Sequence, residues 1–423
     1  MRKVFIPLLA AAVVTAVMFA VLLFFRVYFG VGLPETESVE EKAIAAKALT
    51  DDECAALRWL DYVTGTLDEA EEKAWWDIGA RQFGLFAKRY NIAFAGYAAA
   101  ALGMRGDDDQ RKTAGRIFGN CIGRMLRRDV WAYTQHEKYW GTKPWAPDPC
   151  FRENVMYTGH LLQLLAFYEL FTGDKRYWTE GFDFVWSDGR RIHYDTGKLI
   201  GVTVEQMREN RSGGVTCEPG MMFFPCNNHP HIALRVFSRL GHGDWISEAR
   251  RWEKWALRRF FRPIFGGGAM NMIYYRDRGA FYPRGSIGLD AWSIIWYEPW
   301  AADRRNAFAV WTEVKKALDE ERLSCPSDEY CSEGTCCEPL KIPSSVEAVF
   351  LAAAARTCDD APTASRLESV IDAKFLSRKD GFFMLDMDRE WRIGATAHRI
   401  IALALSNGSS FRAMLRSDKK LSR

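Results

Sequence analysis

The sequence lacks any concentration of charge of one sign. Its 423 residues carry a net charge of +3, and the basic residues are spread along the chain without forming a stripe. Nucleic acid is therefore not an expected partner. Strand-like alternation of apolar and polar residues is also scarce. Because helical periodicity dominates instead, we expect an all-α fold.

Charge is absent altogether from residues 4–25, VFIPLLAAAVVTAVMFAVLLFF, a length that can span a bilayer. Arg2 and Lys3 precede this segment, and the acidic run ETESVEEK follows it. The positive-inside rule then keeps the N-terminus in the cytoplasm and places the rest of the chain in a periplasmic, lumenal or extracellular space. No small-x-small cleavage site follows the segment, so we predict an uncleaved single-pass membrane anchor. A long, cleaved signal peptide is the alternative.

The chain then divides into an anchor at residues 1–30, a linker at 31–50 and one helical domain at 51–423. Ten cysteines suit an oxidising compartment. Four of these cysteines lie in CPSDEYCSEGTCCEP, within residues 325–340, which has neither a CxxC pair nor a nearby histidine. We expect a disulfide-pinned surface insert there rather than a zinc site.

One unit recurs along the domain: an apolar helix, a short break with Gly, Asp or Asn, and an amphipathic helix. Glycine ends the first helix in the left-handed conformation, and Asp or Asn caps the second. The apolar helix should be buried and the amphipathic helix should lie outside. Six such pairs predict a closed (α/α)6 toroid, with an open solenoid as the alternative. The units cover residues 96–118, 160–185, 231–257, 290–314, 345–371 and 395–415.

In a closed toroid the segments that lead into the inner helices meet at one end and form a central pocket. One such segment is GVTCEPGMMFFPCNNHPH, residues 214–231. We expect its helix to begin near Pro230 with Asn227 or Asn228 as the cap. The two cysteines of the segment, nine positions apart, then lie in the connection, beside an apolar Met and Phe wall.

Four interpretations of Cys217 and Cys226 are open. A disulfide between them would be inert, and a zinc site could add His229 as a ligand. Both thiols could instead be structural. The fourth interpretation, which we favour, is acid–base or nucleophilic chemistry in an apolar pocket, where a neighbouring acid or imidazole tunes a thiol.

Four stretches of the sequence resemble the linalool dehydratase/isomerase family: RYNIAFAGYA at 89–98, ENVMYTGHL at 153–161, VTCEP at 215–219 and PCNNHP at 225–230. Their order and separations are similar to those of the family, and the likeness covers most of residues 55–300. It implies an (α/α)6 barrel whose central active site works without a cofactor. It also implies the interconversion of myrcene, linalool and geraniol by hydration, dehydration and allylic isomerisation, and hence a small apolar substrate.

The resemblance also implies which residues do the chemistry. The catalytic positions that it carries over are His160, Cys217, Glu218 and Cys226, and the pocket-lining positions are Tyr90, Met156 and Phe223. Position alone, at the start of the fourth inner helix, adds Asp290 and Trp292 to the pocket. A neutral thiol or carboxylic acid in an apolar site can protonate an allylic hydroxyl, and aromatic faces can stabilise the resulting cation. His160 would orient or deprotonate the neighbouring thiol.

The sequence departs from the family before the first inner helix, where the family's dehydratase has an Asp, a Tyr and a Cys. Residues 61–82 hold no matching Tyr–Cys pair, and Asp61 aligns only with a shift. The substrate or the reaction could therefore differ. We expect no metal, because the acidic residues 107–109 lie in a helix–helix break, where capping and solvation explain them.

Two rival functions remain. Many sugar hydrolases and lyases use the same toroid, with two carboxylates across a polar groove, and Glu153, Glu218 and Asp290 are the candidates for such a pair. A non-catalytic lipid-binding protein is the other rival. The sequence leaves the oligomeric state open.

Overall fold

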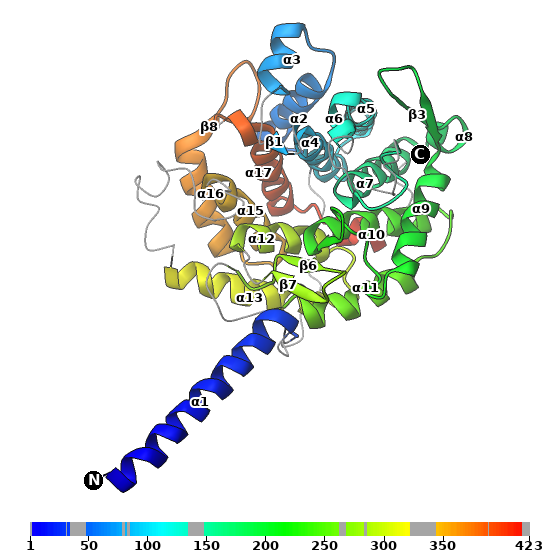
Figure 1. The fold of residues 1–423 in the computed structure, drawn as a ribbon. Coiled ribbons are helices and arrows are strands. Elements are labelled where there is room, and N and C mark those ends of the chain that lie inside the picture. The colour runs from blue at the N-terminus through cyan, green and yellow to red at the C-terminus, as the bar shows by residue number, and fades with distance from the viewer. Residues whose placement is uncertain are drawn as a thin grey trace.

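The computed structural model describes residues 2–30, 32–33, 48–77, 81–82, 85–133, 148–261, 268–282, 286–321, 344–387 and 389–416. Within these residues, six helices form a closed inner ring (Figure 1). They are α4 (Lys88–Gly103), α7 (Val155–Thr172), α10 (Phe224–Arg239), α12 (Ile287–Tyr297), α15 (Ser344–Thr357) and α17 (Arg392–Ser406). Each contacts the next, and α17 contacts α4, so the ring closes as predicted.

A second set of helices in the described residues lies outside this ring. It comprises α2 (Asp51–Thr64), α5 (Asp108–Met125), α9 (Thr196–Glu209), α11 (Ile246–Arg259), α13 (Arg304–Glu321) and α16 (Ala361–Phe375). The inner helix α7 is buried along nearly its whole length, whereas α5, α9 and α11 are amphipathic. This difference matches the predicted pairing of apolar inner helices with amphipathic outer ones, and the (α/α)6 architecture is confirmed.

Two of the predicted helix pairs are wrong in detail. The second half of unit 160–185 holds only the four-residue α8 (Arg176–Thr179) and then the strand β3 (Phe182–Val185), which pairs with β4 (Arg191–Tyr194). Gly181 takes a positive φ of 71° and ends α8, and alternate burial of Phe182 and Phe184 then favours a strand. The outer helix of this pair is α9.

In the last predicted unit, the short α18 (Phe411–Arg416) is largely buried and contacts α10. It does not lie outside the ring. The sixth outer helix comes instead from the opposite end of the domain, because α2 contacts both α4 and α17. The N-terminal part of the domain therefore completes the toroid.

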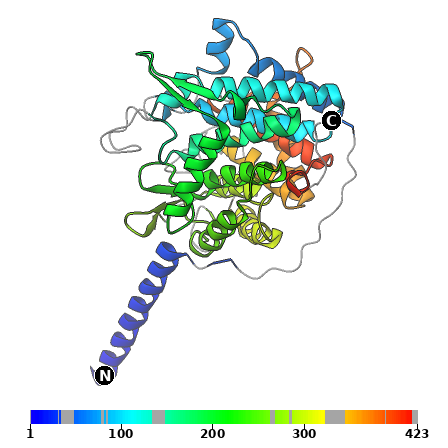
Figure 2. The same ribbon diagram turned by 90° about the vertical axis from the view of Figure 1, so that its right-hand side faces the viewer.

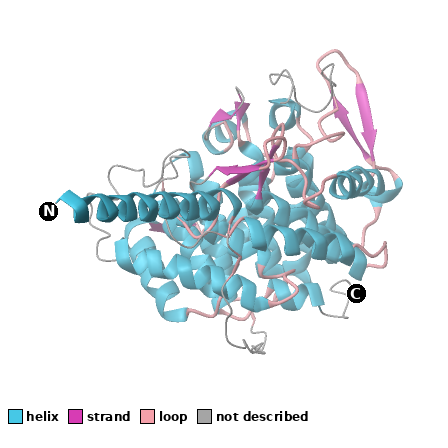
Figure 3. Cartoon of the chain, turned by 60° about the horizontal axis from the view of Figure 1, so that its bottom comes forward, coloured by secondary structure: helices cyan, strands magenta, loops and turns pink. Residues whose placement is uncertain are grey.

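The remaining elements are short and decorate the ring (Figure 3). They are α3 (Glu69–Trp75), β1 (Arg81–Gln82), β2 (Leu85–Phe86), α6 (Arg128–Trp131), β5 (Met221–Phe223), β6 (Ile273–Tyr275), β7 (Ala280–Tyr282), β8 (Leu376–Ser377), β9 (Met384–Leu385) and η2 (Arg389–Trp391). The strands pair antiparallel as β1–β2, β3–β4, β5–β6–β7 and β8–β9.

Close packing and capping fix the inner ring. A Cβ at Gly96 of α4 would lie 2.4 Å from the end of the Leu164 side chain of α7, so any larger residue would force that side chain to shift. Asp107 caps α5 by accepting the backbone N–H of Gln110, and the Gln110 side chain accepts the N–H of Asp107 in return. The acidic residues 107–109 thus serve as a helix cap, as predicted.

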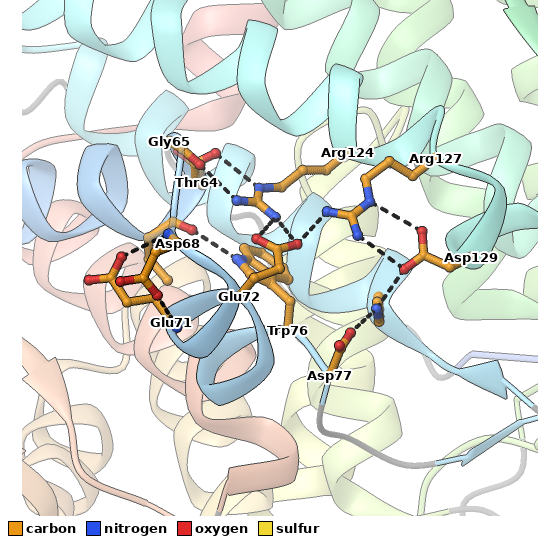
Figure 4. A network of polar contacts seen from close by, with 12 residues as sticks. Thr64, Gly65, Asp68, Glu71, Glu72, Trp76, Asp77, Arg124, Arg127 and Asp129 are labelled. Carbon is orange, nitrogen blue, oxygen red and sulfur yellow. Dashed lines mark hydrogen bonds and ion pairs between the residues drawn. The ribbon is translucent and has the colours of Figure 1, made fainter.

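A polar network fastens the outer layer near α2, α3 and α5 (Figure 4). Arg124 donates to the backbone oxygens of Thr64 and Gly65 at 2.9 and 2.7 Å and pairs with Glu72 at 2.8 Å. Its guanidinium also lies 4.7 Å from the ring centroid of Trp76. One buried cation therefore joins the end of α2 to α3 and α5.

The helix α1 (Arg2–Phe29) extends away from the ring (Figures 1 and 2). Its described apolar side chains, among them Val17, Phe19 and Leu22, are exposed. Among the residues described, no helix is long and apolar enough to cross a membrane. The predicted membrane-spanning segment gains no support from that finding and stays a prediction. The Cys-rich insert near 325–340 and most of the predicted linker lie outside the described residues.

Candidate active site

Two cysteines meet at the start of the third inner helix. Cys217 lies in the connection before β5, where its N–H donates to the carbonyl of Met221 at 2.7 Å, and Cys226 lies in the first turn of α10. Both are buried free thiols, and Cys217 Sγ donates a hydrogen bond to Cys226 Sγ at 3.0 Å. The structure therefore contains no disulfide between these two residues.

The predicted start of this helix was wrong. Helix α10 begins at Phe224, with Pro225 in the first-turn position that we had assigned to Pro230, and Pro230 lies inside the helix. Asn227 does not cap α10. Its side chain accepts from the N–H of Val215 at 2.8 Å and donates to the Val215 carbonyl at 3.0 Å. This clasp holds the connection that carries Cys217 against α10.

The thiol of Cys217 is kept protonated by its surroundings. Burial raises its pKa well above the usual value, and the hydrogen bond to Cys226 and the charge of Glu218 raise it further. The positive charge of Arg89 acts in the opposite direction. A neutral thiol in this position can donate a proton, and the nearby cation favours the thiolate that remains afterwards.

His160 lies on α7, which packs against the helix α10 that carries Cys226, and is fully buried. Its Nδ1 shares a hydrogen bond of 2.8 Å with the hydroxyl of Tyr97, while its Nε2 has no hydrogen-bond partner among the described residues. Burial lowers the pKa of His160 to about 3, so the imidazole is neutral at ordinary pH. A neutral imidazole can accept a proton at Nε2.

Aromatic rings line the space beside His160. The ring of Tyr90 meets those of His160 and Trp292 edge to face, with centroids 5.6 and 5.8 Å apart. Phe94 makes the same kind of contact with both, at 5.9 and 5.6 Å. The Tyr90 hydroxyl also lies 3.5 Å from Met156 Sδ. The structure thus brings Tyr90, Met156 and Trp292 into one cluster with His160.

Sequence reasoning missed four residues of this cluster. Tyr97 orients His160, and Phe94 adds a ring face. His229, the candidate zinc ligand, packs against His160 with the ring centroids 3.9 Å apart and the planes tilted by 38°. The buried guanidinium of Arg89 lies over the rings of Tyr90 and Tyr133, at 4.6 and 4.4 Å. One signal was present: Phe94 and Tyr97 follow Tyr90 at helical spacings of four and seven on α4.

The other predicted site residues, most of them carboxylates, lie in different surroundings from one another. Glu218 is half-buried and pairs with Met221 through its backbone. Asp290, at the start of α12, accepts a hydrogen bond from the N–H of Ala269. This hydrogen bond holds the loop at Ala269 against α12. Phe223 ends β5 and precedes α10. Asp61 pairs with Arg116 at 2.7 Å between the outer helices α2 and α5, and it does not reach the site.

Glu153 and Asn154 stand out because both have a positive φ, of 57° and 65°. Such conformations are strained for residues other than glycine. They turn the chain so that the N–H of Val155 donates to the carbonyl of Thr216, next to Cys217. Glu153 also accepts from the N–H of Gly220 at 3.2 Å. The start of α7 is thus tied to the loop that carries Cys217 and Glu218.

The zinc interpretation finds no matching geometry. Among the described residues, no group of three or more His, Cys, Asp or Glu side chains is arranged to hold a metal ion. His229 Nδ1 shares a hydrogen bond of 2.8 Å with Gln163 Oε1.

Comparison with known proteins agrees with this arrangement. Two solved structures share the fold. An unsaturated glucuronyl hydrolase specific for heparin has 10% sequence identity and a TM-score of 0.51, with 88% of this chain and 98% of that chain covered. Another, from Bacillus sp. GL1 and responsible for the degradation of glycosaminoglycan, has 12% identity and a TM-score of 0.51, with 85% and 97% covered. Residues 89–391 match the linalool dehydratase/isomerase family. The chain belongs to the linalool dehydratase/isomerase family.

Proposed function

We propose that the protein is a cofactor-independent hydro-lyase and allylic isomerase that acts on a small isoprenoid or other apolar allylic alcohol or alkene. One observation carries this proposal: two buried free thiols lie 3.0 Å apart, close enough to Tyr90 for their charges to raise its pKa, and the ring of Tyr90 meets a neutral His160 and Trp292. Membership of the family supports the reaction class.

The first step is proton transfer to the leaving group. The Cys217 thiol, whose pKa burial raises, gives its proton to the hydroxyl oxygen of the substrate. The C–O bond then breaks, its electron pair leaves with water, and an allyl cation remains. The thiolate of Cys217 is stabilised by the positive charge of Arg89.

The cation lies among ring faces that stabilise it. The rings of Tyr90 and Phe94 stack on each other, and each meets Trp292 edge to face. A cation near such ring faces gains about 2 kcal/mol when it is desolvated. The thiolate then removes a proton from a neighbouring carbon to give the alkene and the original thiol. Return of water to the other end of the allyl cation, with its extra proton passing back to the Cys217 thiolate, instead gives the isomeric alcohol and the original thiol.

His160 is an alternative base for the carbon-bound proton. Its Nε2 can accept the carbon-bound proton, since its Nδ1 is fixed by Tyr97 and its neutral form predominates. Proton return to Cys217 would then follow. Glu218 raises the pKa of the Cys217 thiol and so favours its acid form.

The fold likeness to glucuronyl hydrolases leaves the carbohydrate-active alternative open at the level of architecture alone. The site favours the first proposal, because the described contacts of the His160 ring are aromatic and do not include two facing carboxylates.

We also propose that α1 anchors the protein in a membrane, with the domain on the extracytoplasmic side. Residues 4–25 carry no charge, and the described apolar side chains of α1 are exposed. An apolar substrate that partitions into lipid would then be concentrated near the enzyme.

The test of the reaction is incubation of the purified full chain with a panel of isoprenoid alcohols and alkenes, with headspace detection of volatile products. The proposal expects turnover without added cofactor and loss of that turnover in Cys217→Ala. Turnover that survives this change would exclude the thiol as the acid.

A further inference from the structure

After its first turn, the exposed face of α11 is cationic, so the expectation that basic residues form no stripe is wrong here. All exposed side chains after the first turn of this helix are basic: Arg250, Arg251, Lys254, Arg258 and Arg259. The two acids of the helix point inward instead. Glu248 pairs with Arg208 at 2.6 Å, and Glu253 accepts a hydrogen bond from the Tyr297 hydroxyl at 2.6 Å. The inward contacts therefore account for both acids and leave the outer face with one sign of charge.

Folding alone does not account for this cationic face. Arg250, Lys254 and Arg258 follow one another at i, i+4 spacing, where like charges repel and weaken a helix. The helix dipole favours cations in the last turn, which covers Arg258 but not Arg250 or Lys254 in the middle of α11. Positive charge is crowded further at Arg250, because Arg235 of α10 lies close enough for its pKa to be lowered by burial and by the charges of Arg416 and Arg250.

The cationic face adjoins the base of α1. A Cβ at Gly30 would lie 2.0 Å from the carbonyl oxygen of Arg259, so the chain leaving α1 packs directly on the end of α11. Helix α1 also contacts β7. Figure 1 shows α1 leaving the ring on the side where α11 and α13 lie, and Figure 2 shows the same side from a perpendicular direction.

We propose that the cationic face of α11 rests on the anionic headgroups of the bilayer that α1 enters. This inference depends on the proposed anchoring by α1 but not on the proposed reaction. The apolar helix fixes the distance to the lipid surface, and the charge of α11 is complementary to anionic lipid. Because the strand β5 next to Cys217 belongs to the same sheet as β7, this orientation also sets the site close to the lipid surface.

The test uses the full chain reconstituted into phosphatidylcholine vesicles with or without phosphatidylglycerol. A photo-crosslinking amino acid, benzoylphenylalanine, replaces Lys254, and lipid adducts are measured by mass spectrometry. We expect adducts that increase with phosphatidylglycerol. The change Arg250→Glu with Arg258→Glu should lower their yield severalfold, since each cation near an anionic surface raises partition roughly fivefold.

Two matched controls accompany this measurement. The probe placed at Glu69, exposed on α3, should form no lipid adduct, and the change Lys73→Glu with Arg128→Glu, which reverses the same amount of charge at other exposed positions, should leave the yield at 254 unchanged. Equal yields from the two probes, in protein that still floats with the vesicles, would overturn the inference. Protein that fails to float would overturn it together with the anchoring by α1. Turnover of an allylic alcohol, assayed in the same samples, reports on the reaction separately.

Discussion

At the scale of single residues, the pair Cys217 and Cys226 distinguishes this site from an ordinary buried core. We expect Cys217→Ala to lower turnover by about two orders of magnitude or more, because a positioned proton donor contributes roughly that factor. Cys226→Ala should also lower turnover, because Cys226 accepts the hydrogen bond of the Cys217 thiol. The matched control is Cys121→Ala, which removes a buried free thiol of α5. Steady-state rates at saturating substrate are the measurement, and equal losses in all three variants would argue against a specific role.

Buried histidines make the stability of the protein depend on pH. Burial lowers the pKa of His160 and His231 to about 3 and that of His398 to about 4. Each is neutral in the folded state, whereas its unfolded form titrates near 6.5. Below that pH the unfolded chain binds more protons, so stability is lost as the pH falls from 6.5 toward 4.

The variant His231→Phe tests this dependence. It removes one such group, which packs on Trp300 with ring centroids 4.7 Å apart. Between pH 7 and pH 5 we expect the variant to lose about 2 kcal/mol less unfolding free energy than the unmodified protein. Chemical denaturation at the two pH values measures this difference. An identical loss in both proteins would show that His231 is not neutral when folded.

At the scale of elements, the inner ring depends on close approach between α4 and α7. Gly96→Ala would place a methyl group 2.4 Å from Leu164, and we expect overpacking to cost about 1–3 kcal/mol. Gly123 of α5 meets nothing within 4 Å, so Gly123→Ala should instead stabilise the protein by about 0.5–1 kcal/mol. Thermal unfolding of the two variants, which carry the same chemical change, checks the opposite signs.

Helix pairing could be read from the sequence wherever a glycine break joins two long helices. It failed after α7, where strands precede α9, and at the end of the chain, where α2 supplies the outer helix. The sequence also predicts the wrong start for α10. Asparagine often caps a helix, but the side chain of Asn227 accepts its hydrogen bond from Val215 instead. That partner is set by tertiary packing, which periodicity does not encode.

The candidate site could likewise be predicted only in part from the sequence. The motifs identified Cys217, Cys226 and His160, since the chemistry of a thiol or an imidazole is visible in the residue type. The motifs did not reveal the close packing of His229 against His160 or the buried charge of Arg89, because both arise where separate helices meet.

At the scale of the whole molecule, a buried ion pair joins both ends of the domain. Arg105, after α4, pairs with Glu53 of α2, and neither side chain is more than 1% exposed. Arg105 also donates to the carbonyl of Asn407, after α17, at 2.6 Å. When the toroid closes, these polar groups therefore bond to one another instead of to water.

Breaking this pair should be costly. We expect Arg105→Met to destabilise the fold by about 3–5 kcal/mol, because it leaves the Glu53 carboxylate buried without its partner. The double change Glu53→Gln with Arg105→Met should recover part of that loss. Urea denaturation of the two variants is the measurement, and a double variant less stable than Arg105→Met would contradict this account of the pair.

The most direct test of the proposed chemistry measures product formation from an allylic alcohol in three proteins. The full chain is supplied with an allylic terpene alcohol such as linalool or geraniol, with no cofactor added, and volatile products are followed in the unmodified protein, Cys217→Ala and Cys121→Ala. We predict alkene or isomeric alcohol from the unmodified protein and from Cys121→Ala, and none above background from Cys217→Ala. Equal product from all three proteins would contradict the thiol mechanism.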